Sequence, residues 1–237
     1  MNEVERYQSQ QYDPYGSPIY QQGPAPQVIS RRLYNIVLTG FVVLSFVIMA
    51  ACSHIAGTYE FLLFIMRNST MFMIGTFVGS IGGIIAMSIG RAKENLTLGL
   101  IGYALFTLTF GFTTALALMS YSMETISLAF SATAGIMIVF GAAGIMFPQF
   151  FERIQGVLFT GLLAIIVVEL VLALMGVQQS ATDIVVILLF CGFIGYDVHR
   201  ASTAVPTLSN ALWYAIELYL DIINVFIRLL AIFGRRD

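Results

Sequence analysis

The sequence predicts an all-α, polytopic membrane protein with seven transmembrane helices. The first reason is composition: 58% of the 237 residues are hydrophobic and 10% are charged, with a mean hydropathy of +0.87. Soluble domains carry about a quarter charged residues, so this composition excludes an ordinary soluble domain. The second reason is segment length, because a helix that crosses the hydrocarbon core needs about 20 mostly apolar residues. Such segments lie at 33–56, 68–90, 96–119, 125–147, 156–177, 181–204 and 208–233.

The first thirty residues differ in composition from the rest of the chain. They are rich in Gln, Tyr, Pro, Gly and Ser, and such a segment cannot bury a core. We therefore predict a disordered polar tail at 1–30, which could dock protein partners, followed by a transmembrane domain at 31–237. Each of the seven segments in that domain is expected to be apolar on all sides, as is usual for a helix in lipid.

Basic residues predict the orientation of the domain, because cytoplasmic loops carry an excess of Lys and Arg. Placing the N-terminus in the cytoplasm puts the larger basic set inside. The inner set is Arg6, Arg31, Arg32, Arg91, Lys93, Arg153 and Arg200, and the outer set is Arg67, Arg235 and Arg236. The basic C-terminal tip does not suit an odd number of crossings, so a re-entrant sixth segment is an alternative.

Small residues indicate where helices approach closely. Glycines recur every four residues in the second segment and also punctuate the fourth, which is a pattern typical of tight helix packing in membranes. The positions are Gly75, Gly79 and Gly83, then Gly135, Gly141 and Gly144.

Several classes of partner are not expected. The net charge is −2 and no basic block is present, which argues against a nucleic-acid partner. Cys52 and Cys191 both lie in apolar segments and suggest no disulfide. No nucleotide-binding or transition-metal motif appears, so no cofactor is predicted.

The strongest functional signal is a pair of aspartates, Asp197 and Asp221, inside the last two hydrophobic segments. A charged residue at the centre of a transmembrane helix costs about 3 kcal/mol, so such residues usually face a protein interior or an ion path. The two positions are equidistant from position 209, and Pro206 favours a turn close by. Each aspartate is then roughly 18 Å from the turn along its helix, at 1.5 Å per residue. The sequence thus allows the two carboxyl groups to meet at one depth.

Two carboxyl groups that meet in a low dielectric would share one proton, because both cannot ionise cheaply. Such a pair would sense pH: the shared proton holds the helices together, and its loss opens a gap for a cation. Glu217 lies one turn before Asp221 on the same helix face, and Glu169 lies in the fifth segment; both are candidates for the ion path. Alternatively, each acid caps a neighbouring helix or pairs with an arginine.

The C-terminal run resembles a known family. Residues 217–234, ELYLDIINVFIRLLAIFG, are similar to the C-terminal signature of the Bax inhibitor family, and Gly195-Tyr196-Asp197 matches its other marked position. The Arg-Arg-Leu-Tyr-Asn start of the first segment also fits, and the resemblance extends over about residues 30–237.

This resemblance implies a seven-helix bundle with the C-terminal helix at its centre. It also implies a pH-sensitive calcium leak in which Asp197 and Asp221 form the gating pair and contact the permeating calcium. A basic residue after the second span, Arg91 or Lys93, would partner the pair. The resemblance to bacterial members places the chain in a bacterial inner membrane, with calcium and protons as its ligands.

The chain departs from the family pattern in two places. Some members carry an acid in the second span, where this chain has Gly82 and Gly83, and Arg228 lies deep in the last span.

Other functions are open alternatives. An intramembrane aspartyl protease would need Gly-x-Gly-Asp at the second aspartate, and this chain has Leu218-Tyr219-Leu220-Asp221, so no enzyme is predicted. A non-conducting scaffold and a proton-coupled cation antiporter both remain compatible with the sequence.

Overall fold

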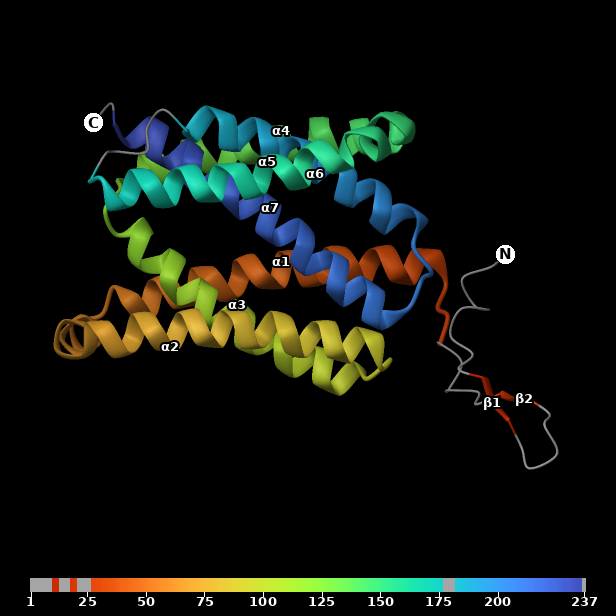
Figure 1. Ribbon diagram of the computed structural model, residues 1–237. Helices are drawn as coiled ribbons and strands as arrows, with labels where there is room; N and C mark the ends of the chain where they lie inside the picture. Colours follow the sequence, from red (N-terminus) through yellow and green to blue (C-terminus); the bar gives the residue numbers. More distant parts are fainter. Residues whose placement is uncertain (1–9, 13–17, 21–26, 177–181, 236–237) are drawn as a thin grey trace.

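The computed structural model describes residues 10–12, 18–20, 27–176 and 182–235, and within them it shows seven long helices and one short hairpin (Figure 1). The predicted all-α fold is confirmed. The helices are α1 (Arg31–Ala56), α2 (Tyr59–Ala92), α3 (Leu96–Leu118), α4 (Met123–Met146), α5 (Pro148–Leu174), α6 (Asp183–Thr203) and α7 (Leu208–Gly234); the strands are β1 (Gln10–Tyr12) and β2 (Pro18–Tyr20).

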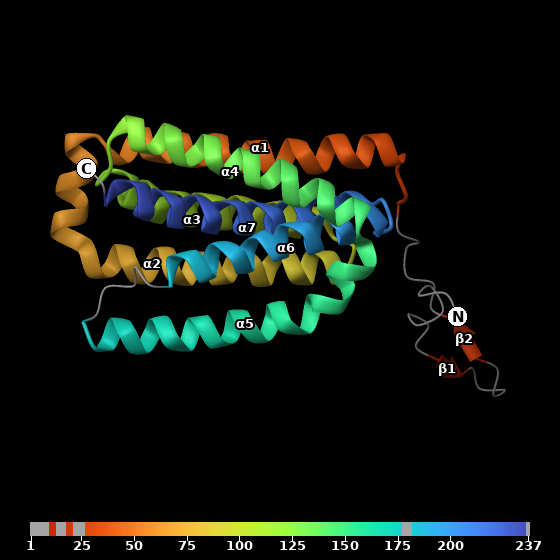
Figure 2. The same ribbon diagram turned by 90° about the horizontal axis from the view of Figure 1, so that it is seen from above.

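The C-terminal helix α7 occupies the centre of the bundle. It packs against α1, α2, α3, α4 and α6, whereas α5 lies outside, mainly against α6 (Figure 2). Tyr219, Ile223 and Val225 of α7 are fully buried, and Tyr219 meets the rings of Phe46 and Phe106 edge to face. The predicted central position of the last helix therefore holds.

Six helices, α1 to α6, are long and apolar enough to cross a membrane, and α7 is the exception. The expectation that every segment is apolar on all sides is wrong for α7, which carries Glu217, Asp221, Asn224 and Arg228. The physical reason is its position: α7 faces other helices rather than lipid, so polar side chains can find partners there.

Two helix boundaries differ from the predicted spans. Helix α2 begins at Tyr59 and is kinked at Asn68, which has a non-helical φ of −128°. The Asn68 side-chain amide donates a hydrogen bond to the Phe64 carbonyl, at the end of the part of α2 that precedes the kink. Helix α5 begins at Pro148, eight residues earlier than predicted. Proline suits the first turn of a helix because its missing N–H needs no partner there.

Helix α6 is continuous from Asp183 to Thr203, so the alternative of a re-entrant sixth segment is not found. As a result, α1 begins and α7 ends at opposite ends of the bundle (Figure 2).

Glycines set the closest helix crossings. Gly83 lies against the backbone of α3, where an added Cβ would be 2.7 Å from the Phe106 nitrogen. Gly144 of α4 contacts the Gly195 carbonyl of α6, which fixes the part of α6 that carries Asp197. The predicted packing role does not extend to Gly75 or Gly135, because an added Cβ there would meet nothing within 4 Å.

The segment before α1 is tied to the α6–α7 turn. Val28 pairs with Thr207 as an antiparallel bridge, the Ile29 N–H donates to the Pro206 carbonyl at 2.8 Å, and Arg31 donates to the Ala204 carbonyl at 2.8 Å. Most of the predicted disordered tail, at 1–9, 13–17 and 21–26, lies outside the described residues, and so do residues 177–181 and Arg236. Within the predicted tail, β1 and β2 pair antiparallel, and Val28 forms the bridge to Thr207.

Candidate functional site

The structure brings Asp197 of α6 and Asp221 of α7 together. Each is 5% exposed, and their carboxyl groups lie within hydrogen-bonding reach of each other. The turn between the two helices produces this register, since Thr207 Oγ1 accepts from the Asn210 N–H at 3.1 Å and starts α7 close to the expected midpoint. Both side chains are therefore at one depth in the bundle interior.

Arg200 supplies the positive charge beside this pair. Its Nη1 donates to Asp197 Oδ1 at 3.1 Å and to both carboxylate oxygens of Glu217 at 3.3 Å. The spacing of Arg200 from Asp197 is three residues along α6, which puts the two side chains on one helix face. One guanidinium thus links α6 to α7.

Two tyrosine rings hold the Arg200 guanidinium from the side. Its central carbon lies 5.3 Å from the ring centroids of both Tyr196 and Tyr214. At such distances a guanidinium is attracted to the ring face, and the attraction grows when water is excluded. The rings therefore limit where the guanidinium can move.

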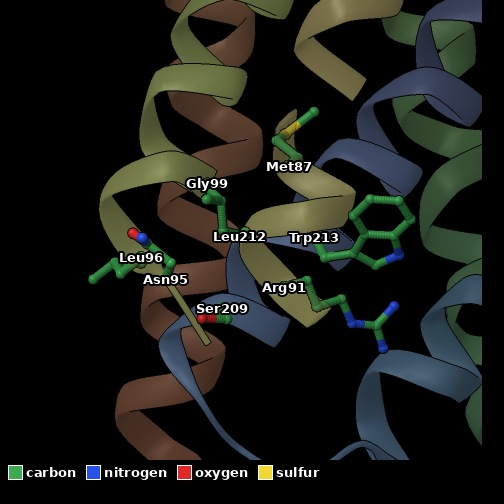
Figure 3. Close-up of a pocket in the computed structure, with 9 residues that line it drawn as sticks. Met87, Arg91, Asn95, Leu96, Gly99, Ser209, Leu212 and Trp213 are labelled. Atoms are coloured by element: carbon green, nitrogen blue, oxygen red, sulfur yellow. The ribbon is translucent and has the colours of Figure 1, made fainter. Parts of the chain in front are cut away.

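Arg91 reaches the same site from α2 but contacts different groups. Its Nε donates to Asn210 Oδ1 at 2.9 Å and one Nη donates to the Tyr214 hydroxyl at 3.3 Å, while its guanidinium lies 5.3 Å from the Trp213 ring (Figure 3). It is also close enough to Glu217 to act on it electrostatically. Arg91 is therefore an outer member of the site.

The sequence predicts Arg91 or Lys93 as the basic partner, and the structure places Arg91 beside the site through Asn210 and Tyr214. Among the described residues, the guanidinium bonded to Asp197 belongs to Arg200, and Lys93 follows the last turn of α2. From the sequence, Arg200 serves only to predict the orientation of the domain. The signal that could have found it is the three-residue spacing from Asp197 on one helix.

The charges of the site balance when it holds one proton. It contains three carboxyl groups and two guanidinium groups, from Asp197, Asp221, Glu217, Arg200 and Arg91. Within the described part of the chain, Asp221 Oδ2 is buried and has no hydrogen-bond partner. A buried ionised oxygen without a partner is costly, so a proton in the aspartate pair removes both the charge surplus and this cost.

A small recess adjoins the site, and Arg91 and Trp213 are among the residues that line it. It is lined by residues of α2, α3 and α7, with Asn95, Ser209 and Arg91 as its polar members (Figure 3). The recess has room for about one water molecule, so it suits a solvent contact rather than an organic ligand.

Glu169, the other predicted ion-path acid, lies in a second charged cluster at the far end of α6 and α7. Its Oε2 accepts from Arg228 Nη2 at 2.7 Å, and its Oε1 accepts from Thr182 Oγ1 at 2.9 Å. Asp183 accepts from both Arg228, at 3.0 Å, and Arg235. The structure therefore brings Glu217 to the aspartate pair and separates Glu169 from it.

The described residues contain no group of three or more His, Cys, Asp or Glu side chains placed to hold a metal ion. Calcium usually takes six to eight oxygen ligands. Contact of calcium with Asp197 and Asp221 stays a prediction.

Comparison with known proteins finds one family model and several relatives that match most of the chain. The sequence model of a family described as "Inhibitor of apoptosis-promoting Bax1" matches residues 26–237. The chain is 27% identical to the inner membrane protein YbhL of Escherichia coli over 94% of this chain and 98% of that protein. It is 29% identical to the Golgi anti-apoptotic protein of vaccinia virus (84% and 82% of the two chains), and 26% identical to an uncharacterized membrane protein of Streptococcus pyogenes (75% and 81%).

Proposed function

The chain belongs to the Bax inhibitor family, and from this premise we propose that it forms a pH-sensitive calcium leak across a membrane, gated by the Asp197–Asp221 pair. The observation that carries the proposal is the contact of two buried carboxyl groups between the central helix and its neighbour. Calcium as the ion comes from the family resemblance rather than from a bound ion.

In the closed state, one proton lies between the two aspartates. A protonated carboxyl donates to the other carboxylate, and such charge-assisted bonds are short and strong. Arg200 balances the remaining charge on Asp197 and Glu217. This arrangement holds α6 against α7 and supports a closed gate at acid pH.

Loss of the proton changes the charge of the site from balanced to −1. Two adjacent carboxylates then repel in a low dielectric, which favours separation of α6 and α7 at the pair. The same negative charge attracts a cation to the gap. The leak is therefore expected to rise as pH rises and to fall as pH falls.

We also propose that the chain lies in a bacterial inner membrane with its N-terminus in the cytoplasm. The positive-inside pattern supports the orientation, and the inner-membrane relative supports the location. The aspartate pair is then in the cytoplasmic half of the protein. The proposed activity is transport, not catalysis, and it needs no cofactor.

The test uses purified protein in liposomes that contain a calcium dye, with the external pH stepped between about 6 and 8. Asp197→Asn and Asp221→Asn remove the titrating groups, and Glu124→Gln, an exposed acid in the first turn of α4, is the matched control. We expect wild type and E124Q to show a calcium flux that rises with pH, and both Asp variants to lose this rise. No flux at any pH from folded wild-type protein would reject the channel and favour the scaffold.

A further inference from the structure

The second charged cluster joins three helices through one side chain. Arg228 of α7 donates from Nη1 to Asp183 of α6 and from Nη2 to Glu169 of α5. The Asp183 and Glu169 side chains are 4% and 18% exposed, and that of Arg228 is 18% exposed. A planar guanidinium suits this geometry, because it can serve two carboxylates at once from a fixed fork.

This cluster lies on the same seam as the aspartate pair. Asp183 and Asp197 are fourteen residues apart on α6, which is roughly 21 Å at 1.5 Å per residue. On α7, Asp221, Asn224 and Arg228 recur at the three- and four-residue spacing of one helix face. The α6–α7 seam thus has a charged contact towards each end, separated by most of the ~30 Å hydrocarbon core.

The two clusters differ in their charge count. Among the described residues, two guanidinium groups, from Arg228 and Arg235, face two carboxyl groups at the far end, so these four charges pair without a proton. A guanidinium stays charged at all pH values of interest. Arg228 therefore keeps a fixed positive charge at the place where a cation that has passed the aspartates would leave the seam.

We propose that Arg228 is a second, pH-independent gate: a tethered cation that occupies the Glu169 and Asp183 carboxylates and excludes free cations from that end of the seam. This inference rests on the proposed leak along α6 and α7, and it adds a residue that sets how easily cations pass. Arg228 acts by its charge and its position. Its removal takes one positive charge from the cluster and the shared cation from the Glu169 and Asp183 carboxylates, while Asp183 keeps its contact with Arg235.

Flux measurements test the charge. Arg228→Gln removes the tethered cation, Arg228→Lys keeps a positive charge but cannot bridge two carboxylates in the same way, and exposed Arg153→Gln is the matched control. With two gates in series, R228Q should raise the calcium flux about tenfold at pH 8, equivalent to ~1.4 kcal/mol of barrier. It should change little at pH 6, where the aspartate gate is closed, and R228K and R153Q should stay near wild type.

A labelling experiment tests the same gate without calcium flux. Asn224→Cys, in a chain with Cys52→Ala and Cys191→Ala, places one thiol between the two gates. R228Q should speed its modification by a cationic, membrane-impermeant thiosulfonate added on the Arg228 side, far more than by an anionic one. R228K should not.

The outcomes separate the two proposals. If wild type leaks but R228Q matches it in flux and in labelling, the second gate is rejected and the leak stands. If R228K behaves like R228Q, Arg228 is only a brace between helices and the gate is likewise rejected. If no variant leaks but R228Q selectively admits the cationic reagent, the calcium leak is rejected, and the exclusion of cations by Arg228 from that end of the seam is supported. Should R228Q not fold, R228Q/E169Q removes the tethered cation without adding a surplus negative charge and retains the Asp183–Arg235 contact; faster labelling by the cationic reagent is again expected, and unchanged labelling would reject the gate.

Discussion

Arg200 and Glu217 are joined across the α6–α7 turn, with one guanidinium nitrogen 3.3 Å from both oxygens of the carboxylate. The same nitrogen also donates to Asp197, so one arginine of α6 connects Asp197 with Glu217 of α7. The balance of charges in the site therefore depends on Arg200 and Glu217 in opposite ways.

Replacing Arg200 with Gln should move the rise of the calcium flux to higher pH. Without this cation, Asp197 and Glu217 lose their counter-charge, and the site keeps its proton more strongly. A shift of about one pH unit would correspond to ~1.4 kcal/mol of lost interaction. Flux recorded in liposomes over a pH series gives the midpoint, with R153Q as the control. An unmoved midpoint would show that Arg200 does not set the proton affinity of the pair.

Replacing Glu217 with Gln should move the rise to lower pH. The site then has two carboxyl groups and two guanidinium groups, so the aspartates lose one negative neighbour and release the proton more readily. The same pH series measures the effect, with E124Q as the control. A shift in the same direction as R200Q would contradict the charge count.

Gly144→Ala should destabilise the bundle, because the added methyl group would collide with the Gly195 carbonyl of α6. Overpacking of this kind typically costs about 1–3 kcal/mol. The measurement is the thermal midpoint of protein in lipid nanodiscs. Gly135→Ala on the same helix is the control and should change little, since its Cβ would meet no atom within 4 Å. Equal midpoints for the two variants would argue against the close α4–α6 crossing.

A disulfide between Val28→Cys and Thr207→Cys should form readily in a chain without Cys52 and Cys191. The two residues are paired as a β-bridge, which places their side chains within disulfide range. Gel mobility under oxidising and reducing conditions reports the bond. Val28→Cys with Ile184→Cys, at the other end of α6, is the control and should stay reduced. Failure of the first pair to cross-link would remove the tie between the N-terminal segment and the α6–α7 turn.

The parts of the site that follow from hairpin geometry could be predicted from the sequence. Pro206 marks the turn, the helical rise is constant, and Asp197 and Asp221 therefore meet. Arg200 was missed as a member of the site because a basic residue near a span end also fits a topology anchor. The sequence predicts both Glu169 and Glu217 as ion-path acids, because it does not show at which end of α7 the fifth helix brings Glu169. The structure places Glu169 at the Arg228 end, away from the aspartate pair.

The fold, too, could be predicted from the sequence only in part. The length of the apolar segments predicted all seven helices, and most of their ends to within a few residues. It failed at the start of α5, because the predicted span begins at 156, whereas the helix begins at Pro148 and includes the polar residues Gln149, Glu152 and Arg153. It also missed the segment of α2 before Asn68. Polar residues at a helix end are compatible with either helix or loop, so tertiary contacts decide there.

The polar character of α7 has a consequence for how the protein is made. Asp and Arg each disfavour membrane insertion of an isolated helix by about 2.5–3.5 kcal/mol at its centre, and α7 carries Glu217, Asp221 and Arg228. The other six helices are apolar enough to cross a membrane by themselves. We therefore expect α7 to insert with the help of the helices that precede it, because its partners Arg200, Asp183 and Glu169 all lie on earlier helices. Insertion of α7 and formation of both charged clusters would then be one event.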